Sequence, residues 1–187
     1  KDLYKKTSIT LQVVGGFIMI CILANIQEVY ALLPEKYSGG IAVVFIISLS
    51  KFFDLMLGNN NSIIFNSKYY RTVLLLGLCL VVLTVSLNMY FIPNFGIEGA
   101  AIATLISIGL YSIAKFLFVV FKMDLFPFSK KTIVSLGIIA LTFIVFYFWS
   151  FSFHPILNIL LKSVLLTLFY WVLNYKCKTS DDINCVI

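Results

Sequence analysis

The chain has 187 residues, of which 61% are hydrophobic and only 12% are charged, and its mean hydropathy is +1.03. About a quarter of the residues of a soluble domain are charged, and so large an apolar excess does not fit inside so small a globule. The composition therefore excludes a soluble globular domain and predicts a protein that uses the bilayer as its apolar solvent. The formal net charge is +6, and most basic residues lie between the apolar runs.

Six apolar runs are long enough to cross a hydrocarbon core of about 30 Å as helices, which takes roughly 20 residues each. The runs are continuous rather than alternating, which favours helices over the strands of a barrel. In chain order they are predicted at residues 7–33, 38–65, 72–92, 97–122, 132–152 and 155–175. Gly15-Gly16 indicates close packing or a bend in the first run, and Pro155 suits the first turn of the sixth. The predicted fold class is an all-α polytopic membrane helix bundle.

The basic residues between the predicted spans are distributed unevenly. With six spans, ten of them fall on one side of the membrane: Lys1, Lys5, Lys6, Lys68, Arg71, Lys122, Lys130, Lys131, Lys176 and Lys178. The opposite side has only Lys36, together with the acids Glu35 and Glu98. Because cytoplasmic loops carry an excess of lysine and arginine, both termini are predicted to be cytoplasmic, and an even number of spans is independently supported.

Lys51 and Asp54 are predicted to lie deep in the second span, with Lys51 roughly 20 Å from either end at 1.5 Å per residue. Asp54 lies three residues further on and so shares its helical face, a stripe that Gly58 and Asn61 continue. A charge at this depth usually faces a cavity or a partner. Two interpretations stay open, namely a functional pair facing a cavity and a structural ion pair between helices.

Lys115 is predicted seven residues before the cytoplasmic end of the fourth span. Its side chain tilts toward the helix N-terminus, which points it back into the membrane. Tyr111 shares its face, as do Thr104 and Ser107. A cavity role and snorkelling to the interface stay equally open for Lys115, whereas Lys162, in the first half of the sixth span, is expected to snorkel to the outer interface.

The third loop and the start of the fourth span, residues 92–104, read IPNFGIEGAAIAT. Pro93 and Gly96 are expected to break the chain at the interface, and the small residues that follow allow close approach of a neighbouring helix. This motif closely resembles the signature of polysaccharide biosynthesis membrane proteins, which are lipid-linked oligosaccharide flippases of the O-antigen type. Residues 49–71 also resemble that family's long helix and basic turn. These flippases belong to the same superfamily as the multidrug and toxin extrusion transporters.

The resemblance implies a protein of two six-helix lobes that face each other across a central cavity and rock between inward-open and outward-open states. Residues 1–122 would be the last four helices of the second lobe, and residues 123–187 two additional helices with a short cytoplasmic tail. The chain begins at Lys1 rather than at methionine and carries no signal-peptide pattern. The first lobe is therefore expected in a missing N-terminal part of the same chain.

The resemblance further implies a multi-pass flippase of the bacterial inner membrane that moves an undecaprenyl-pyrophosphate-linked oligosaccharide for cell-surface polysaccharide. Lys51 and Lys115, with Arg71 near the mouth of the cavity, would offset the charge of the diphosphate. The expected cavity residues are Lys51, Asp54, Lys115, Asn61, Tyr111 and Arg71. Membrane lipids are the other expected partner, and no cofactor, metal or nucleic acid is expected.

Two other functions rank below this one. A cation-coupled multidrug or metabolite antiporter of the same superfamily would favour acidic cavity residues, but Asp54 is the only acid at mid-membrane depth, against Lys51 and Lys115. A membrane acyltransferase or glycosyltransferase needs a catalytic histidine or a carboxylate cluster. His154, in an outer turn, and a lone aspartate do not form one, so no enzyme is predicted.

Overall fold

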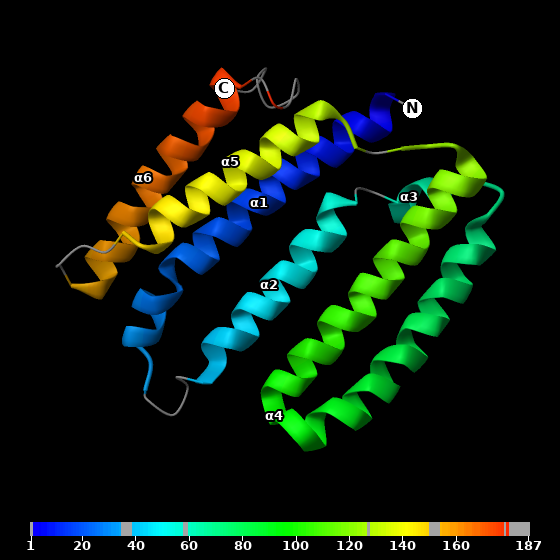
Figure 1. The fold of residues 1–187 in the computed structure, drawn as a ribbon, viewed down its shortest axis with the longest axis horizontal. Helices are drawn as coiled ribbons and strands as arrows, with labels where there is room; N and C mark the ends of the chain where they lie inside the picture. Colours follow the sequence, from blue (N-terminus) through cyan, green and yellow to red (C-terminus); the bar gives the residue numbers. More distant parts are fainter. Residues whose placement is uncertain are drawn as a thin grey trace.

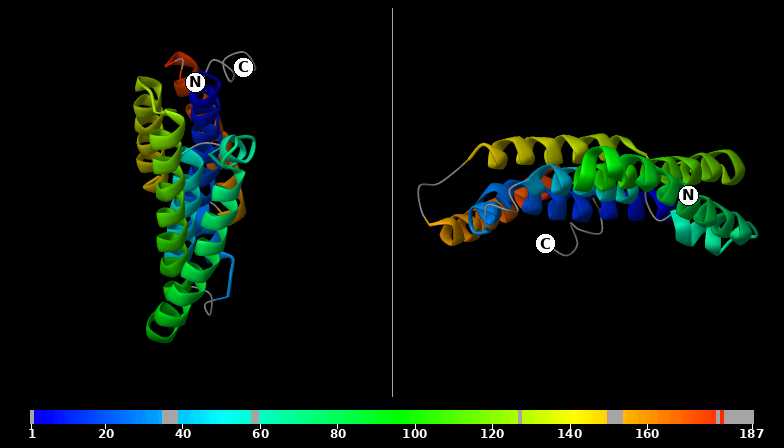
Figure 2. Two further views of the ribbon diagram at one scale, coloured as in Figure 1. Left: turned by 90° about the vertical axis from the view of Figure 1, so that its right-hand side faces the viewer. Right: turned by 90° about the horizontal axis from the view of Figure 1, so that it is seen from below.

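The computed structural model describes residues 2–34, 39–57, 60–126, 128–149, 154–177 and 179. Its helices are α1 (Asp2–Ala31), α2 (Ile41–Met56), α3 (Asn60–Phe65), α4 (Tyr70–Met123), α5 (Lys130–Tyr147) and α6 (Pro155–Lys176). These described segments contain no strand, so the all-α class is confirmed. Helix α1 packs against α2, α5 and α6, and α2 packs in turn against α4. The bundle is consequently broad and flat (Figures 1 and 2).

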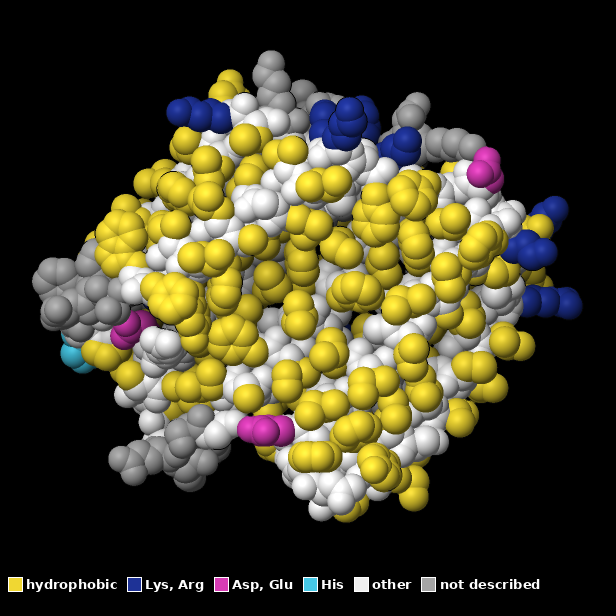
Figure 3. Space-filling model, viewed as in Figure 1, with side chains coloured by type: hydrophobic (Ala, Val, Ile, Leu, Met, Phe, Trp, Pro, Cys, Tyr) yellow, Lys and Arg dark blue, Asp and Glu magenta, His cyan; other side chains and the backbone are white. Residues whose placement is uncertain are grey.

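Within the described residues, four helices are long and apolar enough to cross a membrane, namely α4, α5, α6 and the part of α1 from Tyr4 to Ala31. The start of α1 and the end of α6 lie at the same end of the bundle (Figure 1). On the face drawn in Figure 3, lysine and arginine side chains gather at that end and at the edge beside α3, while apolar side chains cover most of the remaining surface. This distribution suits a protein embedded in a membrane.

Helix α4 corrects the predicted boundary between the third and fourth spans. The helix was expected to end at Pro93-Asn94, but it continues through Pro93 and bends at Gly96, where φ is 58° and ψ is −133°. Only glycine adopts such a conformation without strain. Gly99 is required as well, because a Cβ atom there would overlap the carbonyl oxygen of Phe91. The bend folds the two arms of α4, residues 70–95 and 97–123, back alongside each other (Figure 1).

The second predicted span, residues 38–65, is also corrected. Helix α2 ends at Met56 and the short helix α3 begins at Asn60, while Gly58 and Asn59 lie outside the described residues. The hydroxyl proton of Tyr4 in α1 is shared between the carbonyl oxygen of Leu57, at 3.1 Å, and Oδ1 of buried Asn60. The carbonyl of Leu57 is one of the groups that the end of a helix leaves open, so tertiary contact with α1 holds the break.

Helices α5 and α6 follow the prediction more closely. Helix α5 starts at Lys130, two residues before the predicted start, where the amide of Ser129 donates a hydrogen bond to Thr132 Oγ1, at 3.0 Å. Helix α5 ends at Tyr147 rather than at Ser152, and residues 150–153 lie outside the described part of the chain. Pro155 occupies the first turn of α6, as predicted, behind His154, whose Nδ1 accepts a hydrogen bond from the amide of Ile156.

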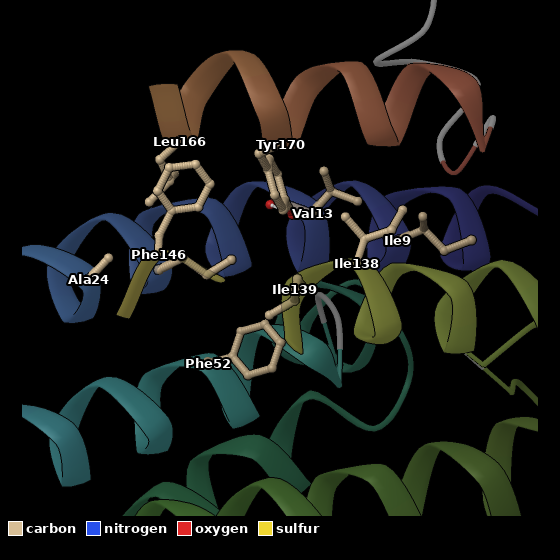
Figure 4. Packing of buried hydrophobic residues seen from close by; sticks show 10 residues of the cluster. Ile9, Val13, Ala24, Phe52, Ile138, Ile139, Phe146, Leu166 and Tyr170 are labelled. Carbon is tan, nitrogen blue, oxygen red and sulfur yellow. Dashed lines mark hydrogen bonds between the residues drawn. The ribbon is translucent and has the colours of Figure 1, made fainter. Parts of the chain in front are cut away.

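The largest apolar core lies where α1 meets α2, α5 and α6 (Figure 4). Its centre is Tyr170 of α6, which is fully buried and donates a hydrogen bond from its hydroxyl to the carbonyl oxygen of Val13, at 2.8 Å. The predicted close packing at Gly15-Gly16 is confirmed. A Cβ atom at Gly15 would lie 2.7 Å from the side chain of Leu55, and one at Gly16 would overlap Ile139. Small residues thus let α2 and α5 approach α1 closely.

Candidate polar site between α2 and α4

An ion pair joins α2 to the second arm of α4. Lys115 Nζ lies 3.2 Å from Asp54 Oδ1, and the hydroxyl of Ser112 donates a hydrogen bond to the same oxygen. Ser112 lies one helical turn before Lys115, so the two donors share a helix face. The side chain of Lys115 is 4% exposed, whereas that of Asp54 is 40% exposed. The cation is therefore enclosed, and the carboxylate forms the open side of the pair.

Tyr111 and Asn61 extend the site toward α3. The ammonium of Lys115 lies 4.1 Å from the centroid of the Tyr111 ring, a cation–π geometry that stabilises a desolvated cation. The Tyr111 hydroxyl donates a hydrogen bond to Asn61 Oδ1, at 3.4 Å. We call this set of five residues the Asp54 site: Asp54, Asn61, Tyr111, Ser112 and Lys115. It combines three elements, of which α3 is the shortest and most exposed.

The charges of the site compensate each other. An isolated lysine buried among apolar helices is costly, and this cost is reduced by the counter-ion Asp54 and by the π face of Tyr111. Oδ2 of Asp54 has no hydrogen-bond partner in the described part of the chain. The site can therefore accept a hydrogen bond or a cation at Asp54 without structural change. Lys115 can bind an anion only after Asp54 moves away.

Four of the six predicted cavity residues meet in the Asp54 site, and Lys51 does not. The expected pair between Lys51 and Asp54 is not formed, because Asp54 binds Lys115 instead. Lys51 is exposed and, among the residues that the structure describes, makes no ion pair. Its expected distance of roughly 20 Å from either end of its helix is wrong as well. Since α2 ends at Met56, Lys51 lies only about 8 Å along the axis from the end of that helix.

Arg71, the sixth predicted residue, also lies apart from the site. It is exposed in the first turn of α4, where its Nε donates a hydrogen bond to the hydroxyl of Tyr70, at 3.2 Å. Its guanidinium also lies 5.8 Å from the centroid of that ring. Thr104 and Ser107, which share the face of Lys115, bond to carbonyl oxygens of their own helix. Helical spacing alone did not select the residues in contact.

Lys162 corrects the expectation of snorkelling. Lys162 is 4% exposed and lies between α6 and α1, near enough to Glu28 for the two charges to attract each other. The same interface holds Asn158, which donates to Glu28 Oε1 at 3.4 Å, and Asn25, which donates to Ser163 Oγ at 3.1 Å. This second polar group joins α6 to α1 and is separate from the Asp54 site.

Ser112 is the contact that the sequence analysis did not select. Its position three residues before Lys115 was a usable signal, but Tyr111, Ser107 and Thr104 showed comparable spacing.

The described residues contain no cluster of histidine, cysteine, aspartate and glutamate that could hold a metal ion. Comparison with protein-family models, with curated proteins and with solved structures gives no match for this chain. The residues of the site and the sequence motif are therefore the basis on which a function can be inferred.

Proposed function

We propose that this chain is the C-terminal part of a membrane flippase that moves an undecaprenyl-pyrophosphate-linked oligosaccharide by alternating access. The observation that carries the proposal is the ion pair of Asp54 and Lys115 between two apolar helices. Ionisable residues at such positions are costly, and they usually mark a transport pathway. The IPNFGIEGAAIAT motif, which resembles the flippase signature, lies at the bend of α4 and so shapes the arm that carries Lys115.

The proposal includes six spans with both termini in the cytoplasm of a bacterial cell. The two arms of α4 count as separate spans, because each is about 40 Å long at 1.5 Å per residue and the bend reverses the chain. Helix α2, at 16 residues, is a short span of about 24 Å. The gathering of basic side chains at the end where α1 starts supports placing that end on the cytoplasmic side (Figure 3).

The open side of the Asp54 site supports a cavity there. A charge exposed to hydrocarbon carries a free-energy cost, which reaches roughly 2.5–3.5 kcal/mol at mid-bilayer even on the lower scales. Asp54 is 40% exposed, so we infer that its open side faces water in the cavity between this lobe and the rest of the transporter. In this arrangement Lys51 is the cation available to an incoming diphosphate, and Lys115 becomes available when Asp54 releases it.

A cation-coupled antiporter is the second candidate, and one observation favours it. The accessible group of the site is the carboxylate, whereas Lys115 is enclosed. In an antiporter, Asp54 would bind the coupling cation, and Lys115 would be the counter-ion of the carboxylate when that cation is absent. The two candidates thus assign opposite importance to the members of the pair, which makes them separable by mutation.

The test is surface glycan in cells that carry the intact protein with single substitutions, measured at matched protein abundance. A flippase for an anionic head group requires that Lys51→Gln and Lys115→Gln each reduce surface glycan and that Asp54→Asn is better tolerated. Arginine should preserve more function than glutamine at both lysines, because it keeps the cation. Lys122→Gln is the matched control, since Lys122 lies on the same arm as Lys115 but is exposed near its end.

Two results decide against the flippase. If a variant that carries both Lys51→Gln and Lys115→Gln keeps full surface glycan, the site does not bind an anionic head group. Loss of transport in Asp54→Asn, with both lysines dispensable, would support the cation-coupled antiporter.

A further inference from the structure

A groove of about 640 Å³ lies at the end of the bundle opposite the basic residues. It is bounded by the end of α1, the start of α2 and the bend of α4, and its volume falls within the range of about 300–1,000 Å³ that is typical of ligand sites. The walls are largely apolar: Val43 and Val44 of α2 face Phe95 and Ile97 on either side of the bend. The groove is therefore suited to a hydrocarbon chain.

Two polar groups border these apolar walls. Glu98, in the first turn of the second arm, is exposed at the groove and makes no ion pair with any residue that the structure describes. The hydroxyl of Tyr30 lies directly over Gly40, where a Cβ atom would overlap it. A carboxylate at the start of a helix complements the helix dipole, and this explains why Glu98 lies in the first turn of the second arm. The helix dipole does not explain why Glu98 lines an apolar groove that Tyr30 also lines.

We propose that this groove binds a phospholipid with a primary ammonium head group. The ammonium binds the Glu98 carboxylate and donates a hydrogen bond to the Tyr30 hydroxyl, while an acyl chain lies between Val44 and Ile97. Charge complementarity selects this class, because Glu98 repels an anionic head group and a quaternary ammonium cannot donate a hydrogen bond. The position at the end of the bundle places the groove near a membrane interface, where head groups lie.

The proposal gives the bend of α4 a role beyond packing. Gly96 turns the chain so that Phe95 and Ile97 both reach the groove, and Glu98 follows one residue later. None of the groove residues belongs to the Asp54 site, which lies toward the α3 end of α2. The proposal of lipid binding in the groove and the proposal of transport through the Asp54 site can therefore be tested independently, and either can be refuted without the other.

The experiment measures lipids retained by the intact, purified protein in native mass spectrometry after exchange into equimolar phosphatidylethanolamine, phosphatidylcholine and phosphatidylglycerol. We expect the unchanged protein to prefer phosphatidylethanolamine by about tenfold, the factor that one charge-assisted hydrogen bond supplies. Glu98→Gln should abolish this preference without reducing total lipid. Equal retention of all three lipids by the unchanged protein, or an unaltered preference in Glu98→Gln, overturns the proposal.

Two matched pairs of variants separate the groove from general effects on folding. Gly40→Ala displaces the Tyr30 hydroxyl and should weaken the preference, whereas Gly109→Ala, which lies outside the groove and has no atom within 4 Å of the added Cβ, should leave it unchanged. Val44→Trp fills the groove and should remove the bound lipid, whereas Val81→Trp adds the same bulk to an exposed position on α4. Equal effects within both pairs contradict the assignment to this groove.

Discussion

The asymmetric burial of the ion pair predicts that its two members differ in their contribution to stability. Asp54→Asn leaves the ammonium of Lys115 enclosed without a counter-ion. Removing one partner of a buried pair costs about 3–5 kcal/mol. Tyr111 and Ser112 remain in place, so we expect a loss near the lower end of that range, about 3 kcal/mol.

Lys115→Met should cost much less. The carboxylate of Asp54 keeps its hydrogen bond from Ser112, and its open side can be hydrated, so we expect a loss of about 1 kcal/mol. The double variant replaces the pair by neutral groups of similar size and should lie within about 1 kcal/mol of the unchanged protein. The resulting coupling energy is about 3–5 kcal/mol, at or above the upper end of the range for residues in contact.

The assay is the free energy of unfolding of the intact protein and the three variants in mixed detergent micelles titrated with a denaturing detergent. Leu117→Met, at an exposed position on the same arm, controls for substitution by methionine. If Lys115→Met destabilises as strongly as Asp54→Asn, the open side of Asp54 does not face water, and the inferred cavity is refuted together with this ranking.

Two further predictions concern the bend of α4 and the break between α2 and α3. Gly96→Ala places a side chain on a strained backbone conformation and should lower the free energy of unfolding by about 1–3 kcal/mol. The control is Gly77→Ala, in a regular part of α4 with no atom near the added Cβ, which should leave the free energy of unfolding unchanged or raise it by about 1 kcal/mol. Tyr4→Phe removes the hydroxyl that binds Asn60 and should cost about 1–3 kcal/mol, measured against Tyr90→Phe, at an exposed position. An equal thermal shift within either pair of variants contradicts the corresponding explanation.

The sequence by itself determined the all-helical class and the approximate position of each long apolar helix. These follow from composition and from the length of the continuous apolar runs, because a helix satisfies all its backbone hydrogen bonds within one segment inside lipid. It also placed Pro155 at a helix start and Gly15-Gly16 at close contacts, since both depend on residue type alone. The sequence also singled out four residues of the site, because polar side chains are rare in apolar runs: Asp54, Lys115, Tyr111 and Asn61.

Only the tertiary structure decided which of these residues meet. Asp54 could pair with either of two cations: Lys51 on the same helix or Lys115, which lies far along the chain. Helical spacing favoured Lys51. The packing of α2 against α4 places Lys115 Nζ 3.2 Å from the carboxylate and leaves Lys51 exposed. The end of α2 at Met56 depends on Tyr4, more than fifty residues earlier. Such choices are made by contacts between distant segments, and local sequence patterns do not contain them.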